Sequence, residues 1–563
     1  MFPRRSVLLL LLALALISVA IRYPLVAHER FQSDSYFIHD VAQDIVGVGR
    51  ATWTFNPLSY FGYYPSSYPA GAPFALAELS VLTGMPVDVC VLFTNMVLAI
   101  LFSLVVFCLA REFMQRIGFV MLAAFLAVIG PRFVDTTYWN GSARGLIVVL
   151  MTMVVFVAFR AGFSRQTRLL AIALLLGLGS LAAHHMATLL LIYGAGYVVA
   201  VLLSSYLRRV HAIPRRRLVV VAAAITGMLG TLVLLNYFTW LGNSLSPFRN
   251  PGIFEVRSQS LAIVLNLIVS YGHQIGFVLI FGILGGILYF RRSHFATRSL
   301  FPLAMGLAFF PVLGNSLYVS MLLSAFVAII GVLWLQKILN SSAKRRRGIV
   351  TTAIVVFMVL SLAFTVWSVQ RWNGYQLPTG DRVEVGDAVF NDASYLRVNG
   401  QNISALSNAV ALQAQLAAFS KVSFLGSGVS AAVNGDVTRK SIENNLSASG
   451  IPFPGNLFTW YRYNDEYFVA RFIEALMMNG VVVVHGAPAN ERLQEYAALH
   501  SNLFVVVDNN WPSTYAGVYG MWRSPFMLEV RNGQIGTTNS ESLASYCMYE
   551  SERTSVFMVQ LPS

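Results

Sequence analysis

The chain has 563 residues, of which 56% are hydrophobic and 11% are charged, and its mean hydropathy is +0.64. About a quarter of the residues in soluble domains are charged, so this composition excludes a soluble enzyme and predicts a polytopic α-helical membrane protein. The net charge of +14 lies in short arginine and lysine clusters between hydrophobic runs, the pattern of loops that face anionic lipid. Membrane lipid is therefore an expected partner, and nucleic acid is not.

The hydrophobic segments predict about eleven membrane spans in a transmembrane domain of residues 1–370. The first follows Arg4 and Arg5. It is not followed by a convincing small-residue cleavage site, so we expect an uncleaved membrane helix rather than a signal peptide. One later segment is expected to break at Tyr271-Gly272-His273. The further spans are predicted near 89–110, 117–130, 145–160, 169–183, 187–207, 218–240, 261–290, 299–313, 316–336 and 349–370.

Basic residues are distributed unequally over the two faces that these spans imply. Twenty arginines and lysines of the transmembrane domain fall on the N-terminal side, and seven fall on the other side. Cytoplasmic loops carry the excess of basic residues, so the N-terminus is expected in the cytoplasm. An odd number of spans then places residues 371–563 outside, and we expect a multi-pass protein of the plasma membrane.

The first outer loop, residues 29–88, holds a cluster of carboxylates. Only nine carboxylates occur in the first 370 residues, and all except Glu112 fall on the outer side. Carboxylates are costly in a bilayer, so a cluster beside one membrane face indicates a site. The stretch YFIHDVAQDIVGVG predicts an amphipathic helix with Asp40 and Asp44 on one face and Asp34 just ahead of it.

The rest of this loop is rich in aromatic residues and proline. Tyr64 and Tyr68 are candidates for stacking on sugar rings. The alternative is an ordinary aromatic belt at the membrane interface.

Two later outer loops add further candidate site residues. Asp135 lies between Arg132 and Arg144, where it is either a site residue or the partner in a salt bridge with one of these arginines. His184 and His185 fall at a tight turn between two apolar helices. The pair either binds a metal or phosphate or caps the turn.

Another outer loop contains Arg249, Glu255 and Arg257. Arginine presents the planar, bidentate donors that suit a phosphate group. Ordinary lipid headgroups are the alternative ligands of these arginines.

The last 190 or so residues, from 371 to 563, change character. Helix-like stretches alternate there with short hydrophobic runs of strand length, which predicts an extracytoplasmic α/β domain. The runs expected to form strands are VGDAVF, KVSFLG, VVVVHG, LFVVVDNN and SVFMVQL.

The sequence has no P-loop and no dinucleotide-binding glycine fingerprint in a strand-to-helix context. Glu112 is the one carboxylate expected on the cytoplasmic side of the membrane domain. We therefore expect any chemistry on the outer side, where nucleotide-activated donors are not present. The activated substrate should be anchored in the membrane.

The segments SDSYFIHDVAQDIVGVG and FNPLSYFGYYPSSYPAGAPFALAELSVLTG resemble the first outer loop of GT-C glycosyltransferases. These polytopic enzymes take sugars from polyprenyl-phosphate carriers and include protein mannosyltransferases and oligosaccharyltransferase catalytic subunits. The resemblance implies a GT-C-like membrane domain with Asp34 as the essential carboxylate. It would act as a base or as a ligand of a divalent cation, Mg²⁺ or Mn²⁺. The superfamily has a second acidic motif in the next outer loop, and Asp135 is its nearest counterpart here. Asp135 is therefore a second candidate catalytic residue and metal ligand.

The sequence also departs from the named members of this superfamily. It lacks the WWDxG motif of oligosaccharyltransferases, and Asn140–Arg144 occupies the place of their second acidic motif. Protein mannosyltransferases have adjacent Asp and Glu residues in the first loop, whereas Ser35 follows Asp34 here.

We expect a hexosyltransferase. It would transfer a sugar from a polyprenyl-phosphate-linked donor to a glycan, lipid or protein acceptor on the extracytoplasmic face. Arg249 and Arg257 would neutralise the leaving phosphate, with His184 or His185 as a donor to it, and Asp40 and Glu255 are lower-ranked contacts. The alternatives are an oligosaccharyltransferase that moves a whole glycan to Asn, a flippase or transporter of lipid-linked sugar, and a catalytically inactive scaffold.

Overall fold

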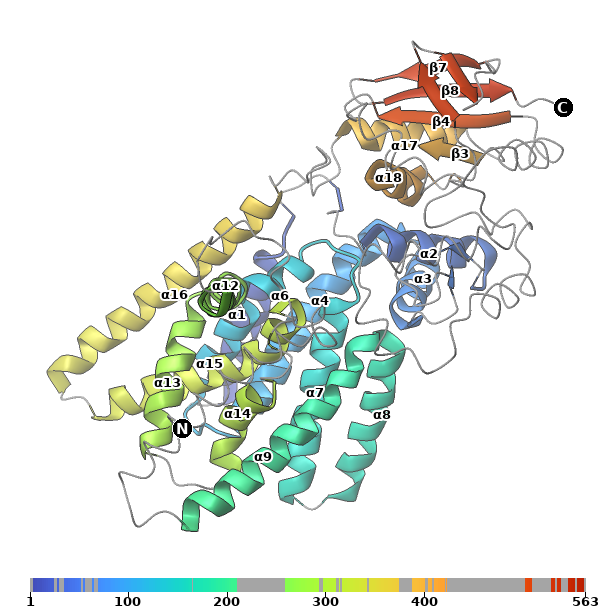
Figure 1. The fold of residues 1–563 in the computed structure, drawn as a ribbon. Helices are drawn as coiled ribbons and strands as arrows, with labels where there is room; N and C mark the ends of the chain where they lie inside the picture. The colour runs from blue at the N-terminus through green and yellow to red at the C-terminus, as the bar shows by residue number, and fades with distance from the viewer. Residues whose placement is uncertain are drawn as a thin grey trace. The chain divides into compact units, whose positions relative to one another are not determined.

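The structure is a computed structural model, and the chain folds into two compact units (Figure 1). The membrane unit comprises Met1–Tyr23, Phe93–Tyr138 and Ala143–Arg371, and the second unit comprises Pro24–Leu92, Trp139–Ser142 and Trp372–Ser563. The described residues are 4–24, 28–29, 35–51, 54–55, 63–64, 69–164, 166–209, 259–292, 297–309, 313, 316–341, 344–373, 387–399, 404–407, 410–420, 422, 502–508, 528–531, 534–537, 545–551 and 554–560.

The membrane unit is built of helices and fits a multi-pass membrane protein. Five of the described helices are long and apolar enough to cross a membrane, or six when one bent pair is taken as a single span. The predicted span at 218–240 lies outside the described residues, so the total of eleven stays a prediction. The helices are α1 (Arg4–Ala20), α4 (Val87–Arg111), α5 (Ile117–Val128), α6 (Pro131–Thr136), α7 (Arg144–Ser164), α8 (Thr167–Ala183), η1 (His185–Leu189), α9 (Leu190–Arg209), α12 (Gln259–Ile275), α13 (Val278–Arg292), α14 (Thr297–Ala308), α15 (Ser316–Ser341) and α16 (Lys344–Asn373).

The bent pair corrects the expected break at Tyr271-Gly272-His273. The chain bends by 114° between α12 and α13, and the bend lies three to five residues later, around Gly276. Gly272 stays helical, whereas Gly276 has a φ of +76°, which favours glycine. A Cβ at Gly276 would also lie 3.3 Å from Pro131 and 3.4 Å from Phe364. Backbone conformation and close packing therefore both place the break at Gly276.

Helix α15 lies at the centre of the membrane unit and is mostly buried. It contacts α5, α12, α13 and α14, and its apolar residues form much of one continuous core. Glycines bring α13 and α15 together: a Cβ on Gly285 would lie 2.8 Å from the carbonyl oxygen of Ile330 and 3.2 Å from the α-carbon of Gly331. Small residues let helix backbones approach closely in membranes, where lipid supplies little hydrophobic driving force.

We expect Gly285→Ala to destabilise the protein by about 1–3 kcal/mol, because its methyl group meets backbone atoms that cannot rotate away. The matched control is Gly272→Ala in α12, where a Cβ has no described neighbour within 4 Å beyond its own helix. The control should leave stability unchanged or raise it by about 0.5–1 kcal/mol. Thermal unfolding in detergent measures both variants, and equal effects would contradict the close contact between α13 and α15.

The second unit contains a four-stranded sheet of order β3-β4-β8-β7, in which β3 runs parallel to β4 and the other pairs are antiparallel. Figure 1 shows α17 and α18 against this sheet and α2 beside α18. Their shared core contains Tyr36 of α2, Leu416 of α18 and Phe504 of β4. The elements are α2 (Ser35–Val48), β1 (Thr54–Phe55), β2 (Tyr63–Tyr64), α3 (Gly71–Thr83), α17 (Asp387–Asn399), β3 (Ser404–Ser407), α18 (Val410–Ser420), β4 (Asn502–Asp508), β5 (Leu528–Arg531), β6 (Gln534–Thr537), β7 (Ser545–Glu550) and β8 (Thr554–Gln560).

Several of the local predictions for this unit can be compared with described elements. The strands expected at LFVVVDNN and SVFMVQL are present as β4 and β8, and the amphipathic helix expected in the first outer loop is present as α2. The strand expected at VGDAVF is wrong, because the helix α17 begins at Asp387. Val389, Ala393 and Leu396 are buried there with helical spacing, which the short run VGDAVF does not reveal. The runs KVSFLG and VVVVHG lie almost wholly outside the described residues.

Candidate functional site

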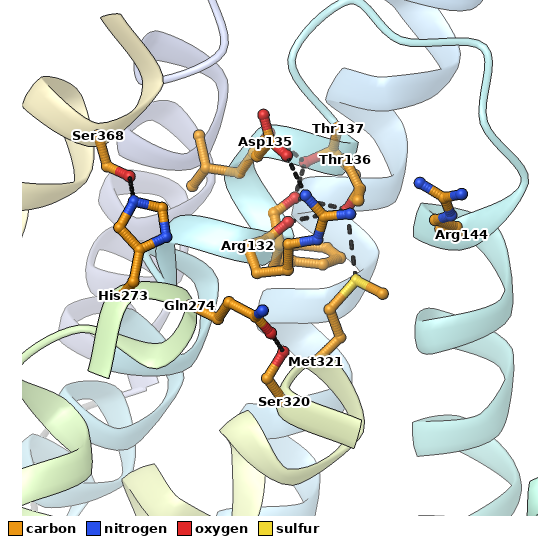
Figure 2. A network of polar contacts seen from close by, with 12 residues as sticks. Arg132, Asp135, Thr136, Thr137, Arg144, His273, Gln274, Ser320, Met321 and Ser368 are labelled. Carbon is orange, nitrogen blue, oxygen red and sulfur yellow. Dashed lines mark hydrogen bonds and ion pairs between the residues drawn. The ribbon is translucent and has the colours of Figure 1, made fainter. Parts of the chain in front are cut away.

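A buried ion pair lies on the short helix α6 of the membrane unit (Figure 2). Pro131 occupies the start of this helix, where its missing N–H is not needed. Arg132 and Asp135 follow one turn apart, and Nη1 of Arg132 donates to Oδ2 of Asp135 at 2.6 Å. The two residues are only 8% and 2% exposed. The salt bridge that the sequence allowed for Asp135 is thus present, with Arg132 as the partner.

A second buried arginine holds the neighbouring helix ends together. Arg22, just beyond α1, donates from Nε to Oγ1 of Thr137 at 2.6 Å and from its other nitrogens to the carbonyl oxygens of Ser18 and Val128. Its guanidinium also lies over the ring of Phe133, 5.0 Å from the centroid. The acceptors come from the ends of α1, α5 and α6, so one side chain joins three helices.

Helices α12, α15 and α16 contribute polar groups around α6 and the residues that join it to α5. Ser320 donates to Oε1 of Gln274 at 2.6 Å, and the hydroxyl of Ser368 lies 3.4 Å from Nε2 of His273. Thr365 of α16 donates to the carbonyl oxygen of Ile129 at 2.6 Å. Figure 2 shows Gln274, Ser320, His273 and Ser368 around α6.

Arg144 and His184 meet Tyr318 in the same unit. Nε of Arg144 donates to the Tyr318 hydroxyl at 3.3 Å, and the His184 ring lies 5.7 Å from the tyrosine ring. Nδ1 of His184 accepts a hydrogen bond from the backbone N–H of Met186 at 3.1 Å, so this histidine caps η1. In the neutral ring the proton is then on Nε2, which makes that nitrogen a donor.

Among the described residues of the membrane unit, the buried charged side chains near α6 are therefore mostly arginines. Arg22, Arg132 and Arg144 are buried, and Asp135 is the only buried carboxylate among the described residues of the unit. Fixed guanidinium groups at the ends of membrane helices favour an anion such as a phosphate group.

The second unit contains a separate buried network at the start of α2. The carboxylate of Glu29, 0% exposed, accepts from the Ser35 hydroxyl and lies 2.6 Å from Nδ1 of His39. The Ser35 hydroxyl in turn accepts from the backbone N–H of Gly141. A Cβ at Gly141 would lie 3.0 Å from the carbonyl oxygen of Ser35 and 3.1 Å from Oε1 of Glu29, so a larger residue would have to shift this network. The backbone that directly follows Asp34 is thereby fixed.

The sequence did not identify Glu29 and His39 as site residues. Ser35 and His39 lie four residues apart on one helix face, and Glu29 is one of few carboxylates in the loop, so this spacing was the available signal. Nothing in the sequence showed that Glu29 turns back onto that face.

Asp40 and Asp44 lie on one face of α2, as the sequence predicts. Burial, and then the neighbouring Asp44 carboxylate, raise the pKa of Asp40 well above its ordinary value. Oδ2 of Asp40 makes no hydrogen bond to any described residue. This environment favours the protonated carboxyl.

The remaining predicted site residues are only partly placed. His185 lies in η1 and Tyr64 in β2, but their side chains are not described. Within the described parts of the chain, no three His, Cys, Asp or Glu side chains gather to hold a metal ion. The predicted site residues outside the described residues are Asp34, Tyr68, Arg249, Glu255 and Arg257.

We expect Asp135→Asn to destabilise the protein by about 3–5 kcal/mol, because it leaves the buried guanidinium of Arg132 without this carboxylate. The double variant Arg132→Met with Asp135→Leu should cost less than the sum of Arg132→Met and Asp135→Leu measured alone. A double-mutant cycle from unfolding in detergent measures the coupling. The control pair is Arg160 and Glu112, where Arg160 is 56% exposed and the coupling should stay below about 1 kcal/mol. Additive changes at Arg132 and Asp135 would contradict a coupled pair.

A second expectation concerns Asp40 and pH. Its pKa is raised in the folded protein, so folding favours the protonated form. Ionisation therefore lowers stability as pH rises from the unfolded value of about 3.9 through the folded value. Asp40→Asn removes this penalty and should raise the unfolding temperature at pH 8, with a gain that shrinks as the pH falls toward the unfolded pKa. The exposed Glu78→Gln is the control, and a pH-independent effect of Asp40→Asn would contradict the raised pKa.

No protein-family model matches the chain, and no curated protein sequence matches it. Solved structures match its fold. The apo oligosaccharyltransferase of Archaeoglobus fulgidus has a TM-score of 0.55 at 12% identity, over 96% of this chain and 75% of that chain. AglB from the same organism, solved with an inhibitory peptide and a dolichol-phosphate, has a TM-score of 0.53 at 11% identity, over 95% and 74% of the two chains.

ArnT from Cupriavidus metallidurans in the apo state has a TM-score of 0.51 at 12% identity, over 98% of this chain and 97% of that chain. Further structures of the archaeal oligosaccharyltransferase contain Zn and sulfate, or a tethered acceptor peptide with the sequon NVT. The chain thus shares its fold with the archaeal oligosaccharyltransferase and with ArnT, and the fold predicted from the first outer loop is confirmed.

Proposed function

We propose that the protein is a membrane glycosyltransferase that transfers a sugar from a polyprenyl-phosphate-linked donor to an acceptor on the extracytoplasmic face. The observation that carries the proposal is the buried arginine cluster around α6 in a GT-C fold. A structural neighbour with this fold holds a dolichol-phosphate. Guanidinium groups at the ends of membrane helices suit the phosphate of such a lipid.

In the proposed reaction, the Asp34 carboxylate takes the proton of an acceptor hydroxyl. The hydroxyl oxygen attacks the anomeric carbon of the sugar, and the bond from that carbon to the phosphate oxygen breaks. The lipid phosphate leaves with the bonding electrons, and direct displacement inverts the anomeric carbon. General-base catalysis of this kind contributes roughly 10²- to 10⁴-fold to the rate.

The leaving phosphate needs positive charge and hydrogen-bond donors. Arg249 and Arg257 are proposed to neutralise it, and His184, with its proton on Nε2, is suited to donate to it. Asp135 is proposed to orient the guanidinium of Arg132, with which it forms an ion pair, and not to act as a base itself. A neutral Asp40 would contact the sugar as a donor rather than as an anion.

A divalent cation is a separate proposal. Asp34 and Asp135 are the candidate ligands from the sequence. The described side chains do not by themselves make a metal site, and Asp135 forms an ion pair with Arg132. When bound, the cation would polarise the donor phosphate, and no step above depends on it.

We expect Asp34→Asn to reduce transfer from a radiolabelled polyprenyl-phosphate sugar by about 10²-fold or more, because the nearly isosteric amide cannot accept the proton. The assay uses membranes that contain equal amounts of wild type or variant, with and without EDTA. Glu78→Gln is the matched control, since it removes an exposed carboxylate of the same loop. Full transfer by Asp34→Asn would contradict the proposal, and loss of transfer in EDTA would establish the cation.

The second candidate is an oligosaccharyltransferase, which the match to the archaeal enzyme favours. The absence of WWDxG from the sequence opposes it. A lipid-linked glycan offered with a sequon peptide separates the candidates, because only an oligosaccharyltransferase glycosylates the peptide asparagine.

The bent pair α12 and α13 resembles the broken helices on which transporters build their sites, and it favours a flippase as a third candidate. Movement of a labelled lipid-linked sugar across proteoliposomes without sugar transfer would support a flippase.

A further inference from the structure

An apolar groove runs along the surface of the membrane unit between α1, α5 and α16, with a volume of about 1560 Å³. This exceeds the roughly 300–1,000 Å³ of ordinary small-molecule pockets. Residues of α1 and α16 form its apolar walls, together with residues of α5 and with Leu339 of α15. The α1 residues Val7, Leu10, Leu14 and Ile17 recur with helical spacing along the groove.

The length of the groove corresponds to one leaflet of a bilayer. The lining residues run from Val7 to Ile17 on α1 and from Thr351 to Leu362 on α16. At 1.5 Å per residue each wall is about 15 Å long, which is half of the roughly 30 Å hydrocarbon core. Leu10, Ile17 and Val359 remain exposed in the groove, at 37%, 39% and 61%. An acyl chain of one leaflet would cover them.

Positive charge lies at one end of the groove. Arg111, Gln115 and Arg116 line it where α4 ends and α5 begins. Arg111 donates to the carbonyl oxygen of Gln115, and Arg116 donates to Oδ1 of Asn340 at 2.7 Å. Neither arginine forms an ion pair with a described residue. Both are exposed, and each guanidinium has further N–H donors for a ligand.

We propose that this groove binds one anionic glycerophospholipid from the leaflet on the Arg111 side of the membrane. Its phosphate contacts Arg111 and Arg116, and an acyl chain lies along α5 between α1 and α16. The charge of the arginines complements the phosphate, and the length of the apolar walls matches one leaflet.

This lipid site is distinct from the arginine cluster around α6. The two arginines precede α5, whereas Arg132 and Asp135 follow it. The twelve residues of α5 separate the two ends by about 18 Å. The bound lipid is therefore neither the proposed sugar donor nor the proposed leaving group.

The test measures binding of phosphatidylglycerol and phosphatidylcholine to the full-length protein in detergent by native mass spectrometry. We expect wild type to retain phosphatidylglycerol more strongly. Arg111→Gln and Arg116→Gln should each weaken its binding about fivefold, and the double variant about 25-fold, with phosphatidylcholine binding unchanged. Arg168→Gln is the matched control, an exposed arginine that does not line the groove, and it should change binding less than twofold.

A second pair of variants tests the apolar part without changing charge. Ala13→Trp fills the groove and should abolish selective phosphatidylglycerol binding, whereas Leu16→Trp, on an exposed α1 position outside the groove, should preserve it. Equal binding of the two lipids by wild type would overturn the proposal. So would an effect of Arg168→Gln as large as those of the groove arginines, or selective binding that survives Ala13→Trp in a folded protein.

Discussion

Buried guanidinium groups constrain the membrane unit, because a charge removed from water must find compensating partners in the protein. Arg22 is fully buried and finds neutral acceptors on three helix ends. Arg132 finds a carboxylate within its own short helix. These requirements bring the ends of α1, α5 and α6 to one place. The polar segment 129–137 thus holds these helix ends together and is also a candidate for anion binding.

Helix α5 separates two environments of opposite character. One end carries buried arginines with defined partners, and the other opens to an apolar groove with exposed arginines at its mouth. The arginines at both ends of α5 suit a phosphate group, but of different kinds of ligand. The buried cluster offers fixed geometry, which suits a reacting group, whereas the exposed pair suits a headgroup that exchanges with the surrounding lipid.

Composition and apolar length predicted the membrane class, and the loop resemblance predicted the GT-C fold, because both are visible in continuous segments. The bend at Gly276 was misplaced because Gly272 and Gly276 look alike in sequence, and only the packing of Pro131 and Phe364 distinguishes them. The helix α17 was mistaken for a strand because six residues cannot separate the two periods. Asp135 was recognisable as a candidate with a possible arginine partner. The Glu29–His39 network was not, since nothing in the sequence shows that Glu29 contacts the helix face of Ser35 and His39.

The core of the second unit has a consequence for biogenesis. Gln43 of α2 donates to the carbonyl oxygen of Ala418, 375 residues later, and Tyr36 shares a core with Val556 of β8. During synthesis from the N-terminus, the first loop is made long before these partners. Its contacts with them cannot form until the C-terminal residues have been synthesised. Contacts at such separation are formed late and slowly. The segment that carries Asp34 would therefore gain its supporting core only near the end of translation, so an immature chain in the membrane would lack that core.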